Sequence, residues 1–86
     1  MTLERLMAAR HHMLDLISLI PNTEDQRDLR RLVGKFDIAM MENRQVEDLG
    51  QLLMMDQSLV VHPTIELHAQ LLERKISQCL ANHCGL

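Results

Sequence analysis

The most restrictive feature of the sequence is an apolar run between residues 13 and 20, directly before Pro21. Every residue of this run is hydrophobic except Asp15 and Ser18. In an α-helix, with about 100° between successive residues, the apolar side chains cover an arc of roughly 220°. A single neighbouring helix cannot cover so wide an arc. The run therefore predicts a helix that is enclosed either by several helices or by a second chain.

Local signals place the first two helices. Thr2 is a favourable N-cap residue and Pro21 cannot continue a helix, so we expect the first helix to span residues 3–20. A turn follows, and the Thr23–Gln26 pattern is typical of a capping box, with Thr23 as the N-cap. The second helix is therefore expected to begin there.

The second helix carries the clearest amphipathic pattern in the chain. Its apolar stripe spans roughly 100° of the helix surface. The stripe loses its phase after Met40, because the next core-like residue, Val46, comes six positions later rather than seven. We predict a break near residues 42–44, with Asn43 as the cap. The alternative is one continuous helix as far as Met55.

A connection over residues 56–63 leads to the last helix, predicted over residues 64–82. Residues 59–61 resemble a strand, but no partner strand is evident elsewhere in the sequence. The last helix places an apolar stripe on one side, whereas Leu67 and Leu71 lie on the opposite side.

Composition points to the same class of fold. Of the 86 residues 47% are hydrophobic, seven are Met, and the only aromatic residue is Phe36. Leu and Met favour helices, and few residues favour strands. We predict a single all-α domain over residues 1–86, with three or four helices in an antiparallel hairpin or bundle that dimerisation completes. The side chains expected in the core or the dimer interface are Met13, Leu14, Ile17, Ile20, Leu29, Leu32, Val33, Phe36, Met40, Ile65, Leu72 and Ile76.

The net charge and the cysteine content argue against several classes of function. A net charge of −3 argues against a nucleic-acid binder, which needs a basic patch. A helix-turn-helix over residues 38–53 would place Glu47 and Asp48 where phosphate contacts are needed. No segment has the pattern of a signal peptide or a membrane span, and two cysteines do not form a disulfide framework. We expect a cytoplasmic protein without nucleic-acid or membrane partners.

The sequence carries no motif that indicates catalysis or cofactor binding. It has no Gly-rich phosphate loop, nucleophile elbow or zinc-protease motif. Cys79, His83 and Cys84 lie close together, but no Cys-x₂-Cys pair accompanies them, and Cys79 also fits a core position. We therefore expect a protein that is not an enzyme, with no catalytic residues, metal, cofactor or small-molecule substrate.

Two segments resemble the TraM family of quorum-sensing antiactivators. One is Arg30-Arg31-Leu32-Val33, followed by Lys35 and Asp37, and the other is Ile65-Glu66-Leu67-His68-Ala69-Gln70. The resemblance implies a small helical dimer that sequesters a LuxR-type transcriptional regulator by protein–protein contact. The first helix and the stretch over residues 42–63 depart from the family pattern.

A second hypothesis comes from another functional class. Small co-chaperones of type III secretion systems are also short, helical and paired, and they cap apolar helices of a secretion subunit before export. No motif in this sequence separates the two hypotheses. Both imply a protein partner and a homodimer.

The predicted partner-binding strip lies on the last helix and consists of Glu66, Leu67, Gln70, Leu71 and Arg74. An apolar pair flanked by polar residues is how a helix presents anchors to a partner. The alternative is that Leu67 and Leu71 complete a wider core. One Met of each of the pairs at 40–41 and 54–55 is also expected near a surface, because adjacent side chains on a helix diverge.

Removing metal ions should leave the fold unchanged. If no metal is required, the melting temperature measured with a chelator equals that measured without one. Loss of helical circular dichroism on chelation would contradict this expectation and would make ligands of Cys79, His83 and Cys84.

Overall fold

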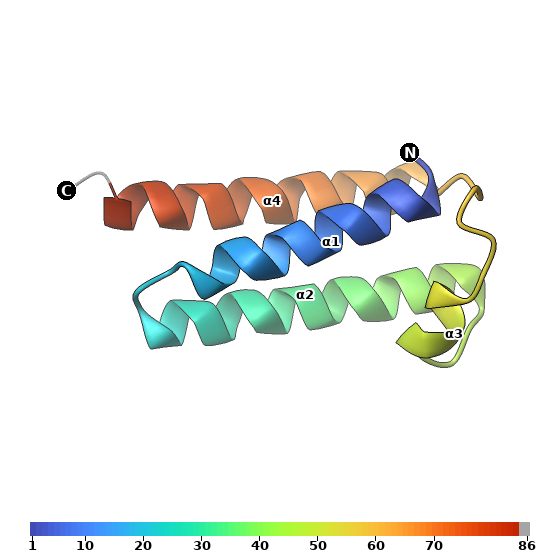
Figure 1. Cartoon of the computed structure of the whole chain (residues 1–86), viewed down its shortest axis with the longest axis horizontal. Helices are drawn as coiled ribbons and strands as arrows, with labels where there is room; N and C mark the ends of the chain where they lie inside the picture. Colours follow the sequence, from blue (N-terminus) through green and yellow to red (C-terminus); the bar gives the residue numbers. More distant parts are fainter. Residues whose placement is uncertain (85–86) are drawn as a thin grey trace.

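The computed structural model describes the backbone of residues 1–84 and the side chains of residues 1–82. Within this part of the chain four helices and no strands are present: α1 (Leu3–Ser18), α2 (Thr23–Arg44), α3 (Leu49–Leu53) and α4 (Pro63–Cys84). The three long helices lie side by side along an elongated body of 43 × 21 × 17 Å (Figure 1). α1 and α4 run in the same direction and α2 runs opposite to both. The predicted all-α class is confirmed.

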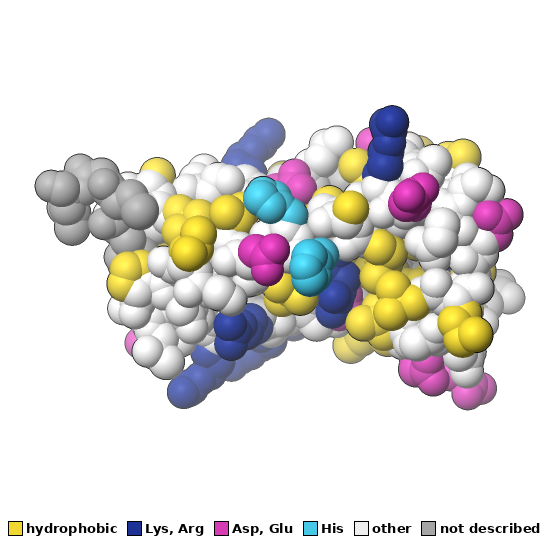
Figure 2. All heavy atoms as spheres, viewed as in Figure 1, with side chains coloured by type: hydrophobic (Ala, Val, Ile, Leu, Met, Phe, Trp, Pro, Cys, Tyr) yellow, Lys and Arg dark blue, Asp and Glu magenta, His cyan; other side chains and the backbone are white. Residues whose placement is uncertain are grey.

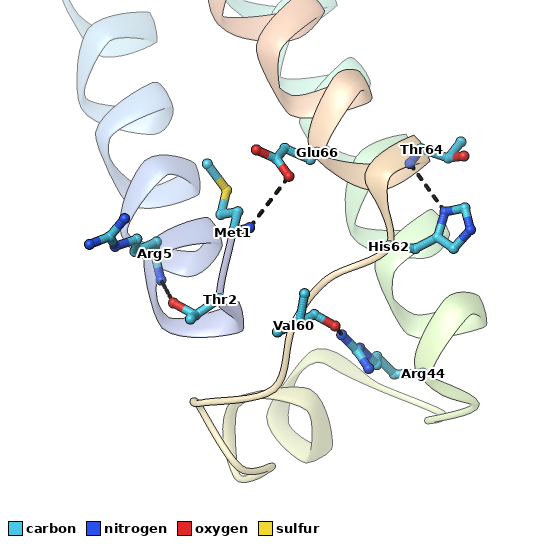
Figure 3. Close-up of polar contacts among 8 residues, drawn as sticks. All are labelled: Met1, Thr2, Arg5, Arg44, Val60, His62, Thr64 and Glu66. Carbon is cyan, nitrogen blue, oxygen red and sulfur yellow. Dashed lines mark hydrogen bonds and ion pairs between the residues drawn. The ribbon is translucent and has the colours of Figure 1, made fainter.

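The starts of α1 and α2 are set by different caps. The Thr2 side chain accepts a hydrogen bond from the Arg5 amide at 3.3 Å, as predicted (Figure 3). At α2 the cap is Asn22 rather than Thr23, because its Oδ1 accepts from the amides of residues 24 and 25. Gln26 does not return to the cap but donates to the Ile20 carbonyl at 2.6 Å. The capping-box prediction was therefore wrong, although α2 does begin at Thr23.

The break after α2 is confirmed, and one continuous helix as far as residue 55 is excluded. Gln45, not Asn43, is the C-cap, and it adopts the left-handed conformation with φ 55° and ψ 42°. Its amide donates to carbonyls of the last turn of α2. Asp48 then caps α3 by accepting from the Gln51 amide at 2.7 Å. α3 folds back against α2.

The core is one cluster to which every element contributes. Phe36 is the largest of its fully buried side chains. Of the predicted core residues, Leu14 and Leu32 are only partly buried, because they lie at the edges of their stripes. The buried residues are Leu3, Leu6, Met13, Ile17, Ile20, Leu29, Val33, Phe36, Met40, Leu52, Val61, Ile65, Ala69, Leu72 and Ile76.

The wide apolar arc of α1 is covered mainly by the chain itself. α1 packs against both α2 and α4, so Met13, Ile17 and Ile20 are buried. Leu14 and Leu16 are partly buried, and Leu19, at 69% exposure, is the main exception. Enclosure by several helices is therefore confirmed. The arc gives no independent reason for a second chain.

The strand-like residues 59–61 have a partner that the sequence did not reveal. Val60 forms an isolated antiparallel bridge with Thr2. Around it, the Leu3 amide donates to the Leu59 carbonyl at 2.8 Å, and the Val61 amide donates to the Met1 carbonyl at 2.9 Å. Figure 3 also shows the guanidinium of Arg44 donating to the Val60 carbonyl. These bonds hold the loop against the start of α1.

The loop before α4 is shaped by its own polar side chains. The Asp56 carboxylate accepts hydrogen bonds from the Ser58 hydroxyl at 2.7 Å and the Ser58 amide at 3.0 Å. These bonds lower the pKa of Asp56, because they favour its charged form. The Gln57 amide group donates to the carbonyls of Leu53 and Met55. The turn therefore directs the chain from α3 back to α4.

One ion pair ties α1 to α2 from outside the core. Arg10 Nε and Nη2 donate to the two carboxylate oxygens of Asp37 at 2.6 and 2.9 Å. Both side chains are largely buried, at 19% and 15% exposure. The hydrogen bonds to Asp37 raise the pKa of Arg10, so the guanidinium remains charged. Such a two-point contact fixes the orientation of both helices as well as their distance.

Breaking this pair should destabilise the fold. Arg10→Ala leaves a largely buried carboxylate unpaired, so the free energy of unfolding should fall by about 1–3 kcal/mol. The double variant Arg10→Met/Asp37→Leu should recover most of the loss, because it removes both charges. Urea unfolding followed by circular dichroism measures both changes. An Arg10→Ala protein as stable as wild type would contradict the structural role of the pair.

Candidate protein-binding surface on helix α4

The side chains of α4 divide into two opposite faces. The inner face carries Ile65, Ala69, Leu72 and Ile76, all buried against the other helices. On the outer face, Leu67 and Leu71 are 54% and 52% exposed. They are one turn apart, so their side chains form a short apolar row. The alternative that they complete a wider core is therefore wrong for the single chain.

The polar members of the predicted strip do not all lie beside the leucines. Gln70 and Arg74 are exposed and flank the leucine row. Glu66 is half-buried on the side of α4 that faces α1. There its carboxylate lies 3.4 Å from the amino group of Met1 (Figure 3). The structure thus brings together Leu67, Gln70, Leu71 and Arg74, and separates Glu66 from them.

A groove between α2 and α4 was not predicted from the sequence. It has a volume of about 400 Å³. Leu29 and Leu32 form its apolar part, and charged side chains from both helices surround them. The lining residues are Asp25, Asp28, Leu29, Arg31, Leu32, Lys35, Lys75 and Cys79. Arg31 and Lys35 are recognisable in the sequence only as polar positions outside the stripe of α2.

The leucine row and the groove are continuous along α4. Leu67, Leu71, Lys75 and Cys79 follow one another at intervals of four residues, so they form a line that turns gradually from the exposed face of α4 toward α2. The first two are exposed, and the last two line the groove. Leu71 therefore lies one helical turn from Lys75, a residue that lines the groove.

Cys79 is one of the residues that line the groove. Its Sγ lies 3.7 Å from Asp25 Oδ2. Partial burial, followed by the nearby Asp25 carboxylate, raises the pKa of the Cys79 thiol. The thiol is therefore protonated at neutral pH and is a weak nucleophile. The described residues contain no cluster of three potential metal ligands, and the side chains of His83 and Cys84 lie outside them.

His68 has a packing role below the groove. Its ring meets Phe36 edge to face, with centroids 5.5 Å apart and an interplanar angle of 89°. Such pairs contribute to stability beyond the area that they bury. The contact joins α4 to the buried Phe36 of α2 and helps to fix the position of α4 along α2.

Other exposed apolar side chains are distributed over several elements. Met54, at 89%, and Val60, at 72%, are the most exposed, and Ile38 lies at 52% on the outer side of α2. On the face shown in Figure 2, hydrophobic side chains form separate groups among charged ones. Of the Met pairs, Met41 is partly buried beside the buried Met40, and Met54 is exposed directly after the end of α3. Leu67 and Leu71 differ from the others because they form a row beside a groove.

Comparisons with known proteins leave the family of this chain open. No family model, curated protein or solved structure matches it. The two segments that resemble TraM lie on α2 and α4, the antiparallel helices that form the groove. No helix in the described part combines the length and the apolar character needed to cross a membrane.

The exposure of the leucine row predicts that it is dispensable for folding. The double variant Leu67→Ser/Leu71→Ser should lose less than about 1 kcal/mol of unfolding free energy, mainly through lower helix propensity. Ile38→Ser, at the same exposure on α2, is the matched surface control. Leu72→Ala on the inner face should cost about 2–5 kcal/mol. Chemical unfolding measures the free energy of unfolding of each variant. A loss in the double variant as large as that in Leu72→Ala would show that Leu67 and Leu71 are buried rather than exposed.

Proposed function

We propose that the chain is a non-enzymatic protein-binding module that holds its partner on the outer face of α4. The observation that carries the proposal is the exposure of Leu67 and Leu71 on successive turns of a long helix that the core already anchors on its opposite side. Exposed apolar rows of this kind provide anchors for a groove or a second helix. A few such anchors usually carry most of the binding energy.

The partner that we propose is a LuxR-type transcriptional regulator in the cytoplasm. Support comes from the resemblance of the α2 and α4 segments to TraM antiactivators. Binding alone is then sufficient for inhibition, because the surface of the regulator that α4 covers is no longer available to bind DNA. A type III secretion subunit is the alternative partner, since an exposed leucine row also suits the capping of an apolar helix.

Loss of the leucine row should weaken inhibition strongly. Added in excess, the wild-type chain should release a LuxR-type regulator encoded in the same genome from its DNA site, as measured by fluorescence anisotropy of labelled DNA. Leu67→Ser/Leu71→Ser should lose at least about tenfold in inhibitory potency, or about 1.4 kcal/mol, whereas Ile38→Ser should act as wild type does. An equally potent double variant would overturn the proposed binding face. Binding to a secretion subunit but not to the regulator would favour the alternative.

We also propose that the chain acts as a homodimer. The resemblance implies a dimer, and exposed apolar side chains remain on the single chain outside the strip, including Leu19 and Met54. Burying even a few hundred Å² of apolar surface favours pairing by several kcal/mol, at roughly 25 cal/mol per Å².

Light scattering at micromolar concentration should give twice the chain mass of 10.0 kDa. The same should hold for Leu67→Ser/Leu71→Ser if pairing and partner binding use different surfaces. A mass near 10.0 kDa for the wild-type chain would contradict the proposed dimer.

A further inference from the structure

We propose that the groove between α2 and α4 receives an amphipathic helix of the partner protein that carries acidic residues on both sides of its apolar stripe. This inference rests on the proposed function and specifies the chemistry of the partner. The basis is the pattern of charge around an apolar floor, which selects one class of helix.

Cations line both walls of the groove. Arg31 and Lys35 come from α2, and Lys75 comes from α4. All three are exposed, and none forms an ion pair with another described residue, in contrast to Arg10. Leu29 and the half-buried Leu32 lie between them. A helix seated on these leucines would place its flanking residues beside a cation on either wall.

Two contacts fix the order of charges along the groove. Cys79 lies against Asp25 near the start of α2, and His68 lies against Phe36 farther along. Both contacts fit one antiparallel alignment of the two helices. In this alignment, a step of four residues toward the start of α4 matches a step of four residues toward the end of α2. In this register Lys75 lies level with Leu29, and the leucine row of α4 continues in the same direction.

The groove therefore has a polarity that a partner helix must match. Asp25 and Asp28 lie at one end, and the three cations follow. In the same register Leu71 lies level with Val33, between Arg31 and Lys35, and Leu67 lies beyond Lys35. A complementary helix carries acidic residues in its middle and an apolar stripe that extends toward the leucines. The lining cations outnumber the acids, in a chain whose net charge is −3, so the groove is locally basic. If two copies met groove to groove, the excess positive charges of the two grooves would repel each other.

Designed peptides test the charge selectivity directly. One peptide of about 18 residues, long enough to span the groove as a helix, has a leucine stripe flanked by Glu on both sides. Its matched control has the same stripe flanked by Lys. Labelled peptide is titrated with the full chain and followed by anisotropy. The wild-type chain should bind the Glu peptide at least about tenfold more tightly than the Lys peptide, and less tightly as the salt concentration rises.

Charge reversal of the groove should invert this preference. Lys35→Glu/Lys75→Glu should bind the Lys peptide more tightly than the Glu peptide. Arg5→Glu/Arg27→Glu makes the same change in net charge outside the groove lining and should keep the preference of wild type. Circular dichroism confirms that each variant is folded, which is expected because all four side chains are exposed.

Cys79 reports whether the peptide occupies the groove. In a Cys84→Ser background it is the single remaining thiol, and the bound Glu peptide should slow its alkylation by iodoacetamide. Unchanged alkylation would place the peptide elsewhere and overturn the proposal. The proposal would also be overturned if the wild-type chain bound the two peptides with equal affinity. The same holds if Lys35→Glu/Lys75→Glu kept the peptide preference of Arg5→Glu/Arg27→Glu. A wild-type dimer that becomes monomeric in Lys35→Glu/Lys75→Glu would assign the groove to a second copy instead.

The experiment separates this inference from the proposed function. If the peptides show no charge selectivity but Leu67→Ser/Leu71→Ser still fails to inhibit the regulator, only the inference fails. If charge selectivity is present but the leucine substitutions leave inhibition unchanged, only the proposed binding face fails.

Discussion

Apolar side chains on one helix are buried only where other parts of the chain surround them, and this fold depends on how α2 and α4 surround α1. The wide arc of residues 13–20 requires neighbours on two sides, and the two longest helices supply them. The Arg10–Asp37 pair then fixes α1 against α2, and the bridge between Thr2 and Val60 holds the loop that leads into α4. Without this loop, α4 would not be directed back along α1.

Because α2 and α4 use one face each to enclose α1, other faces of these helices remain exposed to solvent. α4 needs only one face to complete the core, so the opposite face, with Leu67 and Leu71, is left to solvent. Between α2 and α4 the side chains leave a groove with an apolar floor, whose walls carry three cations and two carboxylates. The core and the proposed binding face therefore use different side chains of α4, and we expect changes on the exposed face to cost little stability.

The sequence alone predicted the helices and most of the core, because the apolar spacing of three and four residues is a local property of the chain. It missed Asn22 as a cap and Gln45 as the left-handed terminus, because cap positions depend on backbone geometry that several neighbouring residues can satisfy. It also missed the Arg10–Asp37 pair, the Thr2–Val60 bridge and the groove. All three depend on the register between distant segments, which a pattern within one helix does not contain. Glu66 was placed in the strip from its sequence neighbours, whereas its side chain is engaged on the side that faces α1.

The central claim is that the leucines of α4 fall into two sets, one required by the core and one free to bind. Methyl-resolved NMR of the isolated chain with a neutral paramagnetic agent measures this directly, because the agent broadens only methyl groups that solvent reaches. The account predicts strong broadening for Leu67 and Leu71 and little for Leu72 and Leu52. Protection of Leu67 and Leu71 to the same degree as Leu72 would contradict it, since the proposed binding face would then already be covered in the protein on its own.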